Sequence, residues 1–188
     1  MSEKQKWPIE QAKAMAVELL SHLYGFCERA QIAGSIRRGK PQVGDIELLY
    51  VPKFEMKSWA GDLLAPGSVN MADEAIKQME LDKVLARRLN VRGFETFGPQ
   101  NKLMVHQASG IPVDLFATTH ANWWVALVVR TGSKETNLRL TTGAQRLGGS
   151  LMAYGCGVKW DNGNVSPAGS EENVFDLCGV PYLPPEER

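Results

Sequence analysis

Apolar side chains in the first 25 residues recur at the spacing of an amphipathic helix. Trp7 and Pro8 precede this pattern, and proline is well tolerated in the first turn of a helix. The positions that share the apolar face are Ala12, Met15, Ala16, Leu19, Leu20 and Leu23. Because Gly25 is placed to end the helix, the pattern predicts one N-terminal helix that packs on the elements that follow.

Four later segments carry the apolar pattern of β-strands, and they cover 30–33, 45–51, 102–106 and 111–116. Between the second and the third, residues 71–90 contain strong helix formers and end in several arginines. This composition predicts a single helix with a basic C-terminal end. Residues 53–70 contain two glycines and a proline without a clear period, so we expect an irregular loop there.

The pattern changes again at Thr118-Thr119, where a helix is predicted to begin that ends near residue 131. A second helix is predicted over 135–146, and Asn162-Gly163 predicts a hairpin between two short strands. Ser170 is a suitable cap for a short helix over 173–178, and the prolines beyond it predict an extended end. We therefore expect an α+β fold in three parts: an N-terminal helix at 1–24, a small mixed sheet with helices at 25–118, and a small α/β part at 119–188.

Composition narrows the functional classes only slightly. The chain has 188 residues, a formal net charge of zero and three cysteines, so binding of nucleic acid would depend on local basic patches. The cysteines are widely spaced and form no CxxC pair, which favours reduced and mostly buried thiols. No apolar run approaches the about 20 residues that span a bilayer, and the polar N-terminus does not resemble a signal peptide. We expect a soluble, cytoplasmic monomer with no membrane contact.

Two carboxylates alternate with apolar residues along the strand predicted at 45–51. Asp45 and Glu47 would project from the same face of that strand, close enough to share one or two divalent cations. Asp114, on the apolar strand predicted at 111–116, is the best candidate for a third carboxylate. The alternative is that Asp45 and Glu47 form the solvated side of an edge strand, and the strand alone does not decide between the two.

A basic turn rich in glycine precedes this acidic strand. Backbone N–H groups of Gly34, Ser35 and Gly44, together with the Ser35 hydroxyl and Arg38, could hold a triphosphate beside the carboxylates. Glycine allows close approach of the backbone, and the arginine fork matches phosphate oxygens. The remaining basic residues of the turn, Arg37 and Lys40, are expected to point into solvent.

Three ordered motifs carry a resemblance to a known family. Gly34-Ser35-x-Arg37-Arg38-Gly39-Lys40, followed by Gly44-Asp45-x-Glu47, resembles the palm motif of the DNA polymerase beta-like nucleotidyltransferases, specifically the family X DNA polymerases. Thr131-Gly132-Ser133-Lys134-Glu135-x-Asn137-x-Arg139 resembles the thumb motif of that family. The segment from Ser170-Glu171-Glu172 to Pro184-Pro185-Glu186 resembles its C-terminal end. Taken without the palm motif, residues 131–133 would be read as a helix end followed by a helix cap.

The resemblance implies a nucleotidyltransferase palm at 25–118 and a thumb at 119–188. It implies that Asp45, Glu47 and Asp114 are catalytic and bind two Mg²⁺ ions, with Mn²⁺ as an alternative, and that Asp114 lies nearest the attacking 3'-hydroxyl. The nucleotide-binding residues that it implies are Gly34, Ser35, Arg38, Gly44, Thr131, Gly132 and Asn137. The candidates for DNA binding are Lys102, Arg130, Lys134, Arg139 and Arg146, although each of them could equally be ordinary surface charge.

This sequence departs from the family pattern at several positions. Glu47 stands where aspartate is usual, and Val129-Arg130 stands where two aromatic residues are common. Pro112 occupies a position at which some members place a basic side chain that orients the carboxylate of Asp114, so another group would have to orient it here. Only one predicted helix precedes the palm, so we expect no lyase activity and weak, salt-sensitive DNA binding.

The resemblance implies transfer of a deoxynucleotide from a dNTP to a DNA 3'-hydroxyl with release of pyrophosphate, as in repair-type filling of short gaps. One alternative is a template-independent transferase that acts on RNA, a protein or a small molecule. Another is a non-catalytic module that binds DNA ends or nucleotides. Dependence of the incorporated base on the template strand distinguishes the first two, and binding of nucleotide without turnover would indicate the third.

Overall fold

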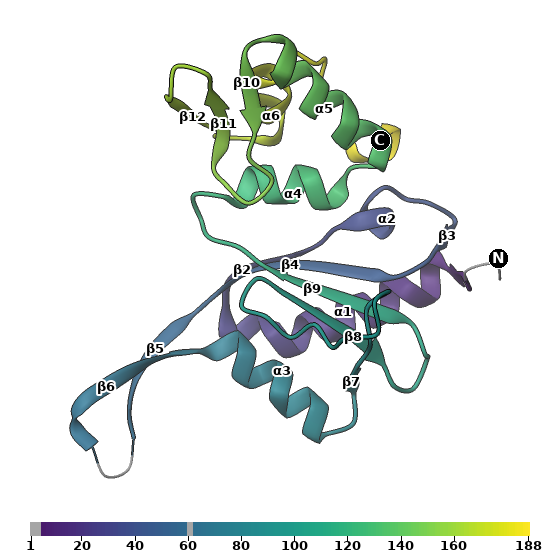
Figure 1. Ribbon diagram of the computed structural model, residues 1–188. Coiled ribbons are helices and arrows are strands. Elements are labelled where there is room, and N and C mark those ends of the chain that lie inside the picture. The colour runs from purple at the N-terminus through teal and green to yellow at the C-terminus, as the bar shows by residue number, and fades with distance from the viewer. Residues whose placement is uncertain (1–4, 60–61) are drawn as a thin grey trace.

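The computed structural model describes residues 5–59 and 62–188, and its largest element is a five-stranded mixed sheet (Figure 1). Its strands run in the order β2-β4-β9-β8-β7, with β4 parallel to β9 and the other neighbouring pairs antiparallel. They are β2 (Cys27–Ile32), β4 (Ile46–Pro52), β9 (Pro112–Ala117), β8 (Asn101–His106) and β7 (Leu85–Arg87). The α+β class and the mixed sheet predicted from the sequence are confirmed.

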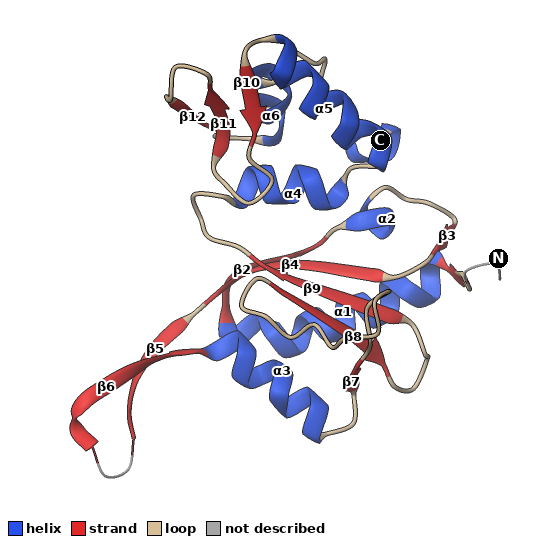
Figure 2. Cartoon of the chain, viewed as in Figure 1, coloured by secondary structure: helices blue, strands red, loops and turns tan. Residues whose placement is uncertain are grey.

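Two helices cover one face of this sheet. These are α1 (Ile9–Leu23), which matches the predicted N-terminal helix, and α3 (Met71–Leu81). Together with the inward side chains of β4 and β9, they form the largest apolar core. Figure 2 shows both helices on the same side of the sheet.

The single helix predicted over 71–90 was wrong, because the chain leaves the helix after Leu81. Lys83 has a φ of 58°, a left-handed conformation that stops the helix, and Leu85–Arg87 then forms β7 at the sheet edge. The apolar positions after residue 83 therefore belong to a strand.

The irregular loop predicted over 53–70 was also wrong, within the residues that the structure describes. Phe54–Trp59 (β5) pairs antiparallel with Asp62–Asn70 (β6), whereas residues 60–61 lie outside the described part of the chain. This hairpin extends away from the sheet (Figure 1). Phe54, Glu55 and Met56 are all exposed, so this part of β5 lacks the buried alternating face by which a strand is recognised in a sequence.

The opposite face of the sheet is covered by α2 (Gly34–Arg37) and α4 (Trp123–Thr131) (Figure 2). Leu49 and Phe116 of the sheet pack there against apolar side chains of α4. The helix predicted to begin at Thr118-Thr119 thus begins at Trp123. On this face, Glu47 and Asp114 lie two positions before Leu49 and Phe116 along their strands, beyond the apolar patch.

The C-terminal part has its own core, in which the inner sides of α4 and α5 meet a three-stranded antiparallel sheet and α6. Its further elements are α5 (Lys134–Arg146), β10 (Gly149–Leu151), β11 (Gly157–Trp160), β12 (Val165–Pro167) and α6 (Glu171–Leu177). The predicted hairpin at Asn162-Gly163 and the Ser170 cap are confirmed, since the Ser170 side chain accepts a hydrogen bond from the Asn173 N–H. The chain end is not fully extended, because Pro185–Glu187 forms a 3-10 turn.

The remaining elements are short: β1 (Trp7–Pro8) pairs with β3 (Gln42–Val43), and η1 (Tyr24–Phe26) joins α1 to β2. The division of the chain at residues 24 and 118 stays a prediction, and residues 1–4 of its first part lie outside the described residues. No helix in the described part of the chain is long and apolar enough to cross a membrane.

Candidate functional site

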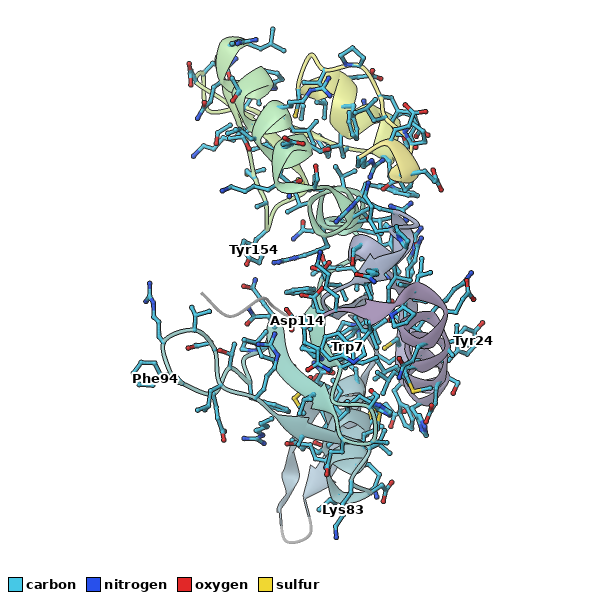
Figure 3. All side chains as sticks on the ribbon, turned by 90° about the vertical axis from the view of Figure 1, so that its right-hand side faces the viewer. Trp7, Tyr24, Lys83, Phe94, Asp114 and Tyr154 are labelled. Carbon is cyan, nitrogen blue, oxygen red and sulfur yellow. The ribbon has the colours of Figure 1, made fainter. Side chains whose placement is uncertain are left out.

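Two of the predicted carboxylates are direct neighbours in the sheet. Glu47 on β4 lies opposite Asp114 on β9, and Asp45 immediately precedes β4, where its charge acts on Glu47. Figure 3 shows Asp114 in the middle of the molecule, between the sheet and the C-terminal helices. Burial, followed by the charges of Asp45 and Asp114, raises the pKa of Glu47 from 4.5 to about 7.

The carboxylate of Glu47 lies against the backbone of Gly34, at the start of α2. A Cβ added at Gly34 would overlap Glu47 Oε2, and Gly34 also has a φ of +62°. Glycine is therefore required at this position for two independent reasons. The close approach also shows how the extra methylene of Glu47, compared with aspartate, is accommodated: the longer side chain occupies the space that a side chain at residue 34 would fill.

The glycine turn presents an unused hydroxyl group beside these carboxylates. Ser35 Oγ is buried and makes no hydrogen bond to any residue that the structure describes. Buried hydroxyl groups normally have a partner, so an unpaired one in a polar turn fits a group that accepts or donates from outside the chain. Gly44 lies half-buried just before Asp45, with open space where its Cβ would be.

The two arginines of the turn contact the Thr131-Gly132 segment. The Arg38 guanidinium donates from Nη1 to the carbonyl oxygens of Thr131 and Gly132, the latter at 3.0 Å. Arg37 donates to Thr131 Oγ1 at 2.8 Å, and it also forms an ion pair with Glu171. The expectation that Arg37 points into solvent was therefore wrong. The structure joins the predicted palm and thumb motifs through these side chains.

Gly132 and Asn137 are in close contact within the second motif. A Cβ at Gly132 would come within 2.8 Å of Asn137 Oδ1, and Asn137 Nδ2 donates to the Val129 carbonyl oxygen at 2.8 Å. Asn137 Oδ1 is buried without a hydrogen-bond partner among the described residues. This second unpaired polar atom belongs to another residue that was predicted to bind nucleotide.

The predicted DNA contact at Lys102 was wrong. Lys102 lies on the core side of β8 and is fully buried, with its Nζ 2.8 Å from Asp73 Oδ1 and 3.0 Å from the Gly98 carbonyl oxygen. A buried and paired ammonium group cannot contact a phosphate at the surface. Lys134, Arg139 and Arg146 are exposed on α5, as surface contacts require.

Arg130 is only partly exposed and is held by two aromatic rings. Its guanidinium carbon lies 3.7 Å from the centroid of the Phe116 ring, and Nη2 donates to the Tyr154 hydroxyl at 3.0 Å. Its positive charge also acts on Glu47, where it opposes the rise in pKa. Arg130 is thus a neighbour of the acidic cluster as well as a candidate DNA contact.

Arg88 was not predicted as a site residue, yet it forms an ion pair with Asp114. The sequence predicts Arg88 at the end of a helix, whereas the structure places it just beyond β7. No signal in the sequence relates the two residues, because their proximity depends on the pairing of three strands.

The donor set fits a divalent cation in its chemistry. Carboxylate oxygens are the ligands that Mg²⁺ prefers. Burial, followed by the charges of Asp45 and Asp114, raises the pKa of Glu47, and a bound cation would offset the repulsion between these charges. The described residues contain no group of three His, Cys, Asp or Glu side chains gathered closely enough to hold a metal ion. The binding of Mg²⁺ by Asp45, Glu47 and Asp114 stays a prediction.

Comparison with known proteins relates this arrangement to the DNA polymerases. Residues 126–188 match the family model described as DNA polymerase beta thumb. DNA polymerase lambda of Rattus norvegicus is 29% identical over 170 residues, a match that covers 82% of this chain and 28% of that protein. Together, these two matches support a family X polymerase-like protein. In this polymerase-like chain, the thumb match begins within α4 and includes every later element of the C-terminal core.

Proposed function

We propose that this polymerase-like protein transfers a deoxynucleotide from a dNTP to the 3'-hydroxyl of a DNA end, in repair-type filling of short gaps. The 3'-oxygen attacks the α-phosphorus, and a new P–O bond forms as the bond to the bridging oxygen of the pyrophosphate breaks. The hydroxyl proton passes to Asp114, and pyrophosphate is the leaving group. The matched polymerase spans far more residues than this chain does, so the acceptor is inferred from the site and the motifs together.

The observation that carries this proposal is the row formed by Glu47 and Asp114 on neighbouring strands, with the Gly34-Ser35 turn directly against it. The turn offers the unpaired hydroxyl of Ser35 to a phosphate group, next to side chains that would hold cations. Two Mg²⁺ ions held by Asp45, Glu47 and Asp114 would lower the pKa of the 3'-hydroxyl and neutralise the charge that develops on the pyrophosphate.

The remaining roles follow from the contacts around this row. Arg38, with Gly44, is proposed to bind the β- and γ-phosphates, which requires its guanidinium to leave the carbonyl oxygens of the thumb motif. Gly132 and Asn137 would contact the sugar and base, for which the unpaired Asn137 Oδ1 provides an acceptor. Lys134, Arg139 and Arg146 on the exposed side of α5, with Arg130, would contact the DNA backbone.

The test is extension of a one-nucleotide gapped duplex with dNTP and Mg²⁺ or Mn²⁺. Asp45→Asn should abolish extension, because it removes a proposed cation ligand with almost no change in side-chain volume. Asp82→Asn is the matched control, since Asp82 is exposed at the end of α3, and it should extend at the wild-type rate. Wild-type activity in Asp45→Asn would disprove the proposal.

The same assay separates the alternative acceptors. Changing the template base opposite the gap should change which dNTP is incorporated. Incorporation that ignores the template base would instead favour a template-independent transferase. Binding of Mg²⁺–dNTP without turnover on DNA, RNA or protein acceptors would indicate a non-catalytic module.

A further inference from the structure

Arg88 lies in the same row of the sheet as the proposed catalytic carboxylates. Glu47 is opposite Asp114, Asp114 is opposite Leu103, and the Arg88 N–H donates to the Leu103 carbonyl oxygen at 3.1 Å. Side chains of residues that lie opposite each other on neighbouring strands project from the same face. Arg88 therefore emerges on the carboxylate face, one strand beyond Leu103.

Its guanidinium group is anchored at two atoms. Arg88 Nη2 donates to Asp114 Oδ1, and Arg88 Nε donates to the carbonyl oxygen of Met104 at 3.1 Å. Because the guanidinium is planar, two hydrogen bonds in different directions fix both its position and the orientation of its plane. The Asp114 carboxylate is thus held by a charged donor that the backbone itself keeps in place.

On β9, the residue that precedes Asp114 on the same face offers it no hydrogen-bond donor. This residue is Pro112, whose ring carries no donor. We propose that Arg88 is the positioning residue for Asp114, setting the direction of its carboxylate from across the sheet. This rests on the proposed function, in which Asp114 accepts the proton of the 3'-hydroxyl, and Arg88 acts through Asp114.

The adjacent residue provides a matched control. Arg87 is also an arginine in ion pairs, but its Nε is 2.9 Å from Glu80 Oε1 and its Nη1 is 3.4 Å from Glu95 Oε2. Its guanidinium carbon lies 4.3 Å from the centroid of the Phe97 ring. As the neighbouring residue along an extended backbone, it projects from the opposite side to Arg88. Loss of Arg87 removes comparable surface interactions and leaves Asp114 untouched.

The experiment compares Arg88→Ala, Arg88→Lys and Arg87→Ala in gap filling at saturating DNA. Arg88→Ala should lower kcat about 100-fold, the typical cost of a misplaced catalytic group, while KM for the dNTP changes less than about 3-fold. Arg88→Lys should recover part of that loss, because lysine keeps the charge but cannot make both anchoring bonds. Arg87→Ala should retain the kcat of the wild type.

Three results would overturn the proposal: wild-type kcat in Arg88→Ala, an equal loss of kcat in Arg87→Ala, or an effect of Arg88→Ala that is confined to KM.

A second measurement does not depend on activity. In the nucleotide-free protein, the urea unfolding midpoints of Arg88→Ala, Asp114→Asn and the double variant should be non-additive. If the wild type extends no acceptor, the proposed function fails. The unfolding measurements then test the contact between Arg88 and Asp114 by themselves, and additive changes in the midpoints would refute that contact.

Discussion

Arg37 and Glu171, which lie 134 positions apart in the chain, form a bidentate ion pair. The distance from Nη1 to Oε1 is 2.7 Å, and that from Nη2 to Oε2 is 2.8 Å. Arg188 approaches the same carboxylate from the chain end, with Nη1 3.3 Å from Oε1. Arg37 also holds Thr131 Oγ1, so the glycine turn, the thumb motif and the last helix meet at one buried carboxylate. This cluster therefore ties the turn at the edge of the sheet to the C-terminal core, alongside the packing of α4 on Leu49 and Phe116.

Glu171→Gln should destabilise the protein by about 3 kcal/mol, because it leaves two partly or fully buried arginines without their anionic partner. Urea unfolding followed by tryptophan fluorescence measures the loss. Glu172→Gln is the matched control: Glu172 is exposed in the same helix and should change stability by less than about 0.5 kcal/mol. Equal effects of the two substitutions would show that the cluster contributes nothing specific.

The same carboxylate predicts a dependence of stability on pH. Burial alone would raise the pKa of Glu171, but the hydrogen bonds and charges of Arg37 and Arg188 outweigh it and hold the pKa below its ordinary value of 4.5. When folding lowers the pKa of a carboxyl group, its ionised form stabilises the folded state. This stabilisation is complete at pH values above the pKa of the unfolded chain, and it is lost as the pH falls through the lower pKa of the folded state. Unfolding midpoints should therefore drop below about pH 4.5 in the wild type, and drop less in Glu171→Gln. Identical pH profiles would contradict this assignment.

Gly34→Ala should abolish gap filling, because the new Cβ would overlap Glu47 Oε2 and displace the carboxylate. The backbone strain can be separated from this overlap. Gly39 has a φ of +66°, close to the +62° of Gly34, but open space where its Cβ would be. Gly39→Ala should therefore share the strain, about 1 kcal/mol, and keep most of the activity. Comparable losses of activity in both variants would mean that strain in the turn, and not contact with Glu47, is responsible.

Local patterns in the sequence were sufficient for elements that bury one clear face. The periodicity of α1, the cap at Ser170 and the turn at Asn162-Gly163 each specify structure from neighbouring residues, and each is confirmed. The segment after Leu81 is different, since its apolar residues fit a helix or a strand equally well. Residues 85–87 form a strand because they pair with β8. Such pairing is a long-range property that local sequence patterns do not show.

The candidate site shows the same limit. The carboxylates and the glycine turn could be identified as chemically suitable from their sequence spacing, but the register that sets Glu47 opposite Asp114 could not. Arg88 reaches Asp114 only because β7, β8 and β9 lie in that order. The prediction for Lys102 was wrong because the sequence of β8 does not show which of its two faces is buried. The buried face is the more polar one, which carries Lys102, Met104 and His106.

The corrected position of Lys102 separates stability from DNA binding. Lys102→Met should destabilise the protein by about 2 kcal/mol, because it leaves Asp73, whose side chain is 23% exposed, without its ammonium partner. The affinity of the folded fraction for gapped DNA should not change.

Arg139→Ala, on the exposed side of α5, should have the opposite effects. Its unfolding should not change, its DNA binding should be weaker, and the slope of log affinity against log salt concentration should fall by about 1. Fluorescence anisotropy across a salt series, with urea unfolding of each variant, measures both effects. A reduced salt slope in Lys102→Met would mean that the ammonium reaches DNA after all, which its full burial and its pairing with Asp73 of α3 argue against.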